Sequence, residues 1–173
     1  MLLMPTIKSK KLTEIHLEQI KFNDGAEVHY VLFKNPESVA ILPILNEKKI
    51  ILVKQYRYAI KDYSWEIPAG GIHENETNIN AAKRELREET GYKSEAIEHF
   101  NSFYPSNAMS NEKVHVYKAT CLTKKKIRLT KELLEKDIEV KSFSLSNLFT
   151  MINKGEITDA ATIIAIQLLI NNV

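Results

Sequence analysis

The segment that decides the fold is Gly70–Tyr92, which reads GGIHENETNINAAKRELREETGY. Thr77 is a favourable N-cap residue, and Gly91 stands where the end of a helix favours a left-handed residue. Between them, apolar residues recur at helical spacing. The expected apolar face comprises Ile79, Ala82 and Leu86. The pattern therefore predicts a helix over residues 78–90.

Three carboxylates, Glu85, Glu88 and Glu89, project from one side of this helix because residues three and four apart are neighbours. Like charges at that spacing repel, but a hard divalent cation such as Mg²⁺ takes carboxylate oxygens as ligands. The alternative is a solvated acidic face with an ordinary ion pair between Arg84 and Glu88. The expected loop over residues 69–76 favours a site, since glycine backbone can approach a metal or phosphate closely.

The spacing of the charged residues adds a specific resemblance. Glu76 precedes Arg84 by eight residues, close enough to pair with it and hold the loop. The segment resembles the complete Nudix box, G-x5-E-x7-R-E-U-x-E-E-x-G-U, in which U is apolar. All seven fixed residues of that pattern are present, and Tyr92 at the last apolar position is a mild variation.

The resemblance implies a role for each matching residue. Glu85 and Glu89 would ligate the metal with the carbonyl of Ala69, and Glu88 would ligate a further metal or orient a water. The remaining motif residues would be structural: Gly70, Glu76, Arg84 and Gly91. The expected cofactor is Mg²⁺, with Mn²⁺ as the alternative.

The rest of the chain predicts an α/β protein in which a mixed sheet lies between helices. An antiparallel hairpin is expected over residues 15–33, with its turn at Asn23-Asp24-Gly25. Further strands are expected over 39–45, 49–55, 65–67, 114–121 and 138–143, and further helices over 146–153 and from Thr158 or Asp159 to about Asn171. The family fold, an α/β/α sandwich, agrees. We divide the chain into an N-terminal strand segment, 1–36, and a Nudix domain, 37–173.

The segments that flank the box resemble the ADP-ribose pyrophosphatase branch, which hydrolyses nucleoside diphosphate sugars. By this match Arg57 would bind a substrate phosphate, the alternative being a structural ion pair with a nearby Glu. Glu66 would bind substrate or a magnesium-bound water, and Glu112 would lie near the substrate or serve only at the surface. Where the branch carries Ser-Pro-Gly, this chain has Ser106-Asn107-Ala108, which leaves GDP-sugars and UDP-sugars open as substrates.

The resemblance also implies a general base and an oligomeric state. The branch takes its base from a loop before a late strand, here residues 131–137. Glu135 is the first candidate and Glu132 the second, the alternative being an exposed charged loop. The branch forms homodimers through its N-terminal strands, so we expect residues before Pro36 to pair across a two-fold axis.

Composition excludes several other classes of protein. The 173 residues carry a net charge of +2, too small for a typical nucleic-acid binder, and no apolar run reaches the roughly 18 residues that span a bilayer. Cys121 is the only cysteine, which suits a cytoplasmic protein. We therefore expect neither a nucleic-acid nor a membrane partner. Two alternatives stay open: a nucleotide-sugar sensor without turnover, and a pyrophosphatase of (d)NTPs.

Overall fold

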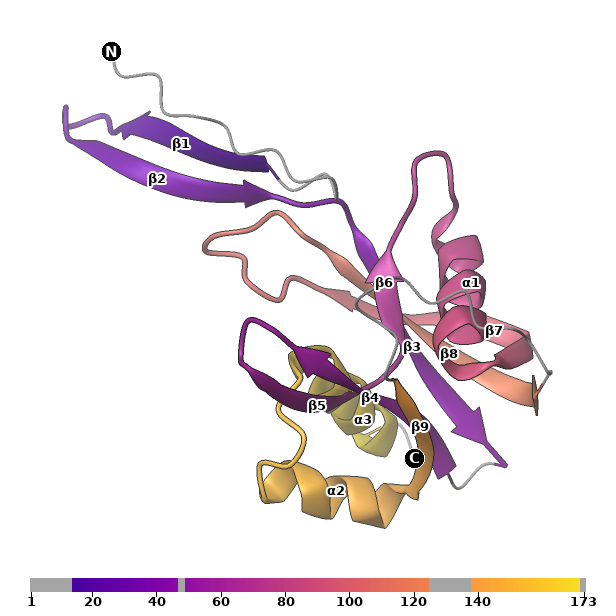
Figure 1. Ribbon diagram of the computed structural model, residues 1–173. Coiled ribbons are helices and arrows are strands. Elements are labelled where there is room, and N and C mark those ends of the chain that lie inside the picture. Colours follow the sequence, from indigo (N-terminus) through magenta and orange to yellow (C-terminus); the bar gives the residue numbers. More distant parts are fainter. Residues whose placement is uncertain (1–13, 47–48, 125–137, 172–173) are drawn as a thin grey trace.

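The computed structural model describes residues 14–46, 49–124 and 138–171. It contains nine strands and three helices in those ranges (Figure 1). In chain order they are β1 (Glu14–Lys21), β2 (Glu27–Lys34), β3 (Ser38–Leu45), β4 (Lys49–Arg57), β5 (Asp62–Glu66), β6 (Ala69–Gly71), α1 (Asn78–Thr90), β7 (Tyr92–Phe103), β8 (Val114–Lys124), β9 (Glu139–Ser144), α2 (Leu145–Asn153) and α3 (Ala160–Asn171).

The expected hairpin is confirmed: β1 and β2 pair antiparallel as a separate two-stranded sheet that projects from the body (Figure 1). The other seven strands form one mixed sheet. Five of them follow the order β5-β4-β3-β8-β7, in which β3 and β8 are parallel, while β6 pairs with β3 and β9 pairs with β4. Helix α1 covers one face of this sheet, and α2 and α3 cover the other (Figure 1). The predicted α/β arrangement of a mixed sheet between helices is therefore confirmed.

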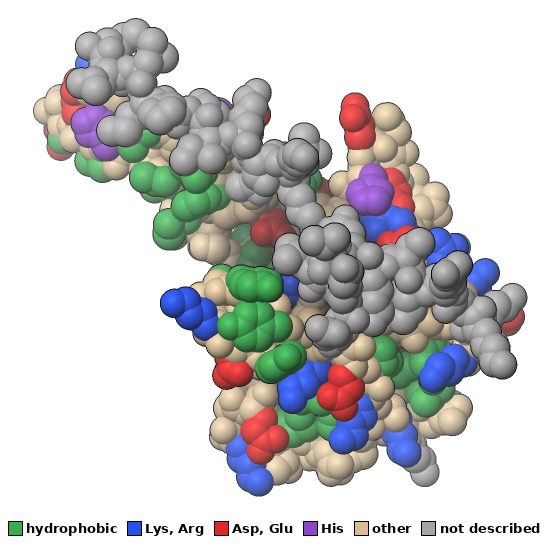
Figure 2. Space-filling view, viewed as in Figure 1, with side chains coloured by type: hydrophobic (Ala, Val, Ile, Leu, Met, Phe, Trp, Pro, Cys, Tyr) green, Lys and Arg blue, Asp and Glu red, His purple; other side chains and the backbone are tan. Residues whose placement is uncertain are grey.

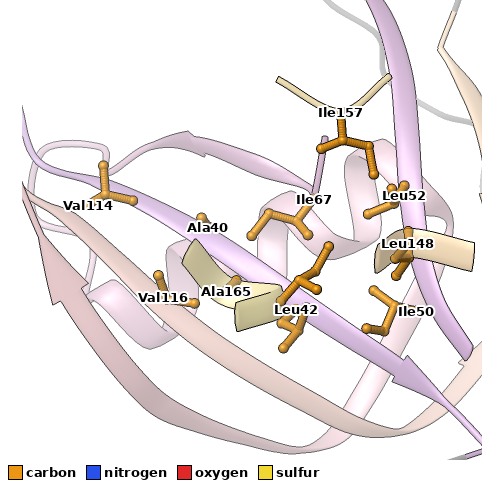
Figure 3. Close-up of a cluster of buried hydrophobic side chains, with 11 residues drawn as sticks. Ala40, Leu42, Ile50, Leu52, Ile67, Val114, Val116, Leu148, Ile157 and Ala165 are labelled. Carbon is orange, nitrogen blue, oxygen red and sulfur yellow. The ribbon is translucent and has the colours of Figure 1, made fainter. Parts of the chain in front are cut away.

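The central strand β3 is buried on both faces, as a strand between two layers of helix must be. Val39 and Ile41 pack against α1, whereas Ala40 and Leu42 face the cluster under α2 and α3. Figure 3 shows this second cluster, in which Leu148 of α2 and Ala165 of α3 approach Leu42. The alternation fixes which face of the sheet each helix covers.

A split in the sheet positions the site. Strands β3 and β4 pair only at their adjoining ends, through Ile44 with Ile50 and Leu45 with Lys49. Beyond those pairs β3 takes β6 as its neighbour, while β4 takes β5 on one side and β9 on the other. The end of β5 and the start of β6 are separated only by Ile67 and Pro68, and they therefore lie where the two halves of the sheet separate.

Three expectations are corrected. Residues 69–71, expected as loop, pair with β3 as strand β6. Ile79, expected on the apolar face of the helix, is 38% exposed, and the buried face holds Ala81 beside Ala82 and Leu86. Strand β7 was not expected at all, because none of the side chains of this edge strand is fully buried and a bulge between His99 and Asn101 interrupts the alternation.

In the described part of the chain, no helix combines the length and the apolar character needed to cross a bilayer.

Candidate functional site

Helix α1 is fixed at both ends by the residues that the sequence indicated. The Thr77 side chain accepts a hydrogen bond from the Asn80 N–H, and Gly91 follows the helix with a φ of 75°. The helix therefore begins and ends as predicted, and its turns place Glu85 and Glu89 on the buried side, at 9% and 3% exposure. Glu88 is half-buried at the edge of this side.

Arg84 is the centre of a dense network of hydrogen bonds. Its Nε and Nη2 donate to Glu76 at 3.0 and 2.8 Å, and Nη2 also donates to the Gly71 carbonyl at 2.9 Å. Its Nη1 donates to Glu85 at 2.5 Å and to Glu88 at 3.3 Å. All five N–H groups of the guanidinium are thereby used. The predicted pairing of Arg84 with Glu76 is confirmed.

This network shifts the ionisation of both partners. The hydrogen bond from Arg84 lowers the pKa of Glu76, against an opposing effect of burial. The pKa of Arg84 is raised, chiefly by its hydrogen bond to Glu76, and further by Glu85. Both groups are therefore charged throughout the neutral range, and they hold the segment after β6 against α1.

Two carboxylates of α1 reach the backbone at the start of β6. The Ala69 N–H donates to Glu89 at 3.2 Å. A Cβ on Gly70 would stand 2.0 Å from Oε1 of Glu85 and 2.2 Å from its Cδ, so only glycine allows the approach. Glu85 and Glu89 therefore converge on one two-residue segment.

Glu85 and Glu89 have side chains of the kind that bind a divalent cation. Carboxylate and carbonyl oxygens are the ligands that a hard divalent cation takes, and these acids fit that chemistry. Among the described residues no three acidic, histidine or cysteine side chains enclose a common point, since Glu85 and Glu88 are turned toward Arg84.

A second cluster lies across the split in the sheet. Glu66, at the end of β5, is 5% exposed, and Arg57 of β4 binds it with Nε at 2.9 Å and also with Nη2. Gln55 donates to the same carboxylate at 3.4 Å. Glu66 raises the pKa of Arg57 through this hydrogen bond, and the charges of Glu89 and Asp159 add to the rise. The ion pair weighed as an alternative is present, and the Arg57 side chain is still 45% exposed.

The remaining predicted site residues lie elsewhere. Glu112 accepts a hydrogen bond from Ser38 at 2.8 Å, at the start of β3. The segment Ser106–Ala108 contacts the hairpin, because the Tyr30 hydroxyl donates to the carbonyl of Ala108. Glu132 and Glu135 lie outside the described residues.

The sequence did not identify one buried link to this site. The Ile67 N–H donates to Thr162 at 2.8 Å, and Thr162 donates in turn to Asp159 at 2.6 Å. Thr162 is fully buried, and burial raises the pKa of Asp159 against the lowering effect of the two Thr162 hydrogen bonds. Only the N-cap position of Asp159 had a sequence signal, since Thr162 reads as an ordinary helical residue.

The chain is similar to known proteins in both sequence and fold. A family model described as the NUDIX domain matches residues 34–163. The chain is 34% identical to an ADP-ribose pyrophosphatase of Bacillus subtilis (strain 168) over 165 residues, which cover 94% of this chain and 88% of that protein. It is 32% identical over the same shares to a methanol dehydrogenase activator of Bacillus methanolicus.

A solved structure, the crystal structure of an ADP compounds hydrolase, superposes with a TM-score of 0.83. It covers 96% of this chain and 89% of its own, at 19% identity, and therefore speaks for the fold alone.

Proposed function

Because the chain belongs to the NUDIX domain family, we propose that it hydrolyses the pyrophosphate bond of ADP-ribose or a related nucleoside diphosphate sugar. The products are a nucleoside monophosphate and a sugar phosphate. The observation that carries the proposal is the convergence of Glu85 and Glu89 on the backbone of Ala69 and Gly70.

The proposed cofactor is Mg²⁺, with Mn²⁺ as the alternative, held by Glu85, Glu88, Glu89 and the carbonyl of Ala69. When bound, the cation neutralises phosphate charge and lowers the pKa of a bound water. Arg84 compensates the charges of Glu85 and Glu88 in the structure. These carboxylates would exchange Arg84 for the cation, while Glu76 keeps Arg84 in place through two other hydrogen bonds.

Substrate binding is assigned to the cluster of Arg57, Glu66 and Gln55. Arg57 would hold a phosphate through its exposed edge, since the guanidinium fork matches phosphate oxygens. Glu66 accepts hydrogen bonds from both Arg57 and Gln55. Its proposed role is therefore to orient Arg57 toward the substrate. Glu112 would contact the substrate at the start of β3.

The general base is proposed to be Glu135, with Glu132 second, from the segment before β9. Glu135→Gln should slow turnover far more than it weakens metal binding. The measurement is kcat beside a metal titration, and unchanged turnover would eliminate Glu135.

We also propose that the N-terminal segment 1–36 pairs two copies into a cytoplasmic homodimer of domains 37–173. Hydrophobic side chains are exposed along the hairpin (Figure 2). Leu17 and Val31 lie opposite each other there, each 41% exposed. Apolar pairs in such a position are typical of surfaces that another chain covers.

The deciding experiment is a substrate panel with Mg²⁺, comprising ADP-ribose, ADP-glucose, GDP-mannose, UDP-glucose, diadenosine polyphosphates and dNTPs. Released monophosphate is measured by chromatography, with Glu89→Gln as the control variant. Metal-dependent cleavage of a nucleotide sugar, lost in the variant, is the expected result. Preferred cleavage of dNTPs would favour the (d)NTP pyrophosphatase, and tight binding without cleavage would favour a nucleotide-sugar sensor.

A further inference from the structure

A pocket of about 440 Å³ lies on the outer side of α1, where the helix meets the start of β7. It is separate from the cluster of Arg57 and Glu66, neither of which lines it. Its charged lining residues are Glu76, Lys83, Arg84, Arg87 and Lys93. Four cations and one anion therefore surround the same space.

Local geometry explains why the cations gather. Lys83 and Arg87 are one helical turn apart on α1, so they project from the same face. Gly91 ends the helix with a φ of 75°, and β7 turns back immediately afterwards. That reversal brings Lys93 to the face that already carries the other two cations.

The charges in this pocket are unequally compensated. Arg84 and Glu76 neutralise each other, and every N–H of Arg84 is already donated. The nearest carboxylate to Arg87 is Glu88 at 3.8 Å, too long for a hydrogen bond. Among the described residues, neither Lys83 nor Lys93 has a carboxylate within ion-pair distance.

We propose that this pocket binds a phosphomonoester or inorganic phosphate dianion through Lys83, Arg87 and Lys93. Three cations with little compensation repel one another across a concave surface, and a dianion removes that repulsion. Lysine ammonium and arginine guanidinium groups form short, charge-assisted hydrogen bonds with phosphate oxygens, which are stronger than hydrogen bonds between neutral groups. The volume accommodates a small phosphate ester, being within the range of roughly 300–1,000 Å³ usual for ligand pockets.

The test is isothermal titration calorimetry of metal-free protein, kept in chelator at constant ionic strength. Inorganic phosphate and adenosine monophosphate are titrated separately. Saturable binding is expected for the wild type, weakened about tenfold or more in Lys83→Gln/Lys93→Gln, since this variant loses two charge-assisted hydrogen bonds to the phosphate. Equal affinity for both ligands would identify the phosphoryl group as the recognised part, and tighter binding of the nucleotide would add the nucleoside.

Two controls make the result specific. Lys34→Gln/Lys154→Gln removes the same charge from exposed positions outside the pocket and should bind as the wild type does. Arg57→Gln removes the phosphate ligand proposed for the substrate site, so inorganic phosphate that still binds this variant with wild-type affinity is bound by the pocket. Absence of saturable binding in the wild type, equal weakening in the Lys34/Lys154 control, or loss confined to Arg57→Gln would each overturn the proposal. None of these readouts depends on turnover, so the proposed hydrolase activity stands or fails separately.

Discussion

At Gly70 the missing side chain is what lets Glu85 approach β6. Gly70→Ala would place a Cβ within 2.0–2.7 Å of the Glu85 carboxylate. The carboxylate is the mobile end of a side chain, so we expect it to move and the fold to survive. A displacement of about 1 Å at a reacting site costs roughly 10²-fold in rate, which is the loss of kcat expected here.

The neighbouring glycine supplies the control. A Cβ on Gly71 would meet nothing within 4 Å, so Gly71→Ala should keep nearly full activity. Steady-state kinetics and circular dichroism of both variants measure the effect. Equal loss of activity in the two variants would show that the backbone of β6, and not the Glu85 carboxylate, is what requires glycine.

Glu76 gives a pH dependence whose sign is fixed by its lowered pKa. A carboxyl whose pKa is lowered by folding contributes stability above its unfolded value, here 4.5, and loses it as pH falls through the lower folded value. Glu76→Gln should therefore cost about 1.5–3 kcal/mol at pH 7, typical of hydrogen bonds to charged groups. The difference from the wild type should shrink below pH 4.5, as followed by urea unfolding. A difference that stays constant with pH would exclude the ionised pair as its source.

At the scale of elements, α3 is tied to the segment between β5 and β6 by one side chain. Thr162 accepts from the Ile67 N–H and donates to Asp159. Thr162→Val keeps the shape but leaves a buried N–H without a partner, which costs about 1–3 kcal/mol. Denaturant unfolding should show that loss.

A matched threonine tests whether burial is the cause. Thr150 of α2 is exposed, and its hydroxyl donates a hydrogen bond to the Ser146 carbonyl within its own helix. Thr150→Val should change stability by no more than about 0.5 kcal/mol, as surface substitutions usually do. A comparable loss in both variants would mean that the link to Ile67 contributes nothing particular.

At the scale of the whole molecule, the hairpin predicts self-association. Light scattering should give twice the chain mass of 19.9 kDa for the wild type. Leu17→Lys/Val31→Lys places two charges on paired positions of the exposed hairpin and should give the mass of one chain. Lys61→Glu, an exposed charge change outside the hairpin, should leave the mass unchanged. A wild-type mass of one chain would refute the dimer.

The sequence by itself determined the parts of this protein that depend on neighbouring residues. Helix α1, its Thr77 and Gly91 caps and the pairing of Arg84 with Glu76 all followed from spacing, because these contacts span at most eight residues. The hairpin followed from its turn, because the reversal at residues 23–25 brings Lys21 opposite Glu27 and the remaining pairs extend outward from there.

Only the tertiary structure decided what joins distant segments. Thr162 and Ile67 are 95 residues apart, and no local pattern marks a hydroxyl that will meet a backbone N–H. The pairing of Arg57 with Glu66 had been one of two alternatives, because residues on adjacent strands meet only once strand register is fixed. Strand β6 likewise exists only because β3 leaves β4 and exposes an edge to pair with. Local periodicity therefore specified the carboxylates, and the split sheet specified what stands opposite them.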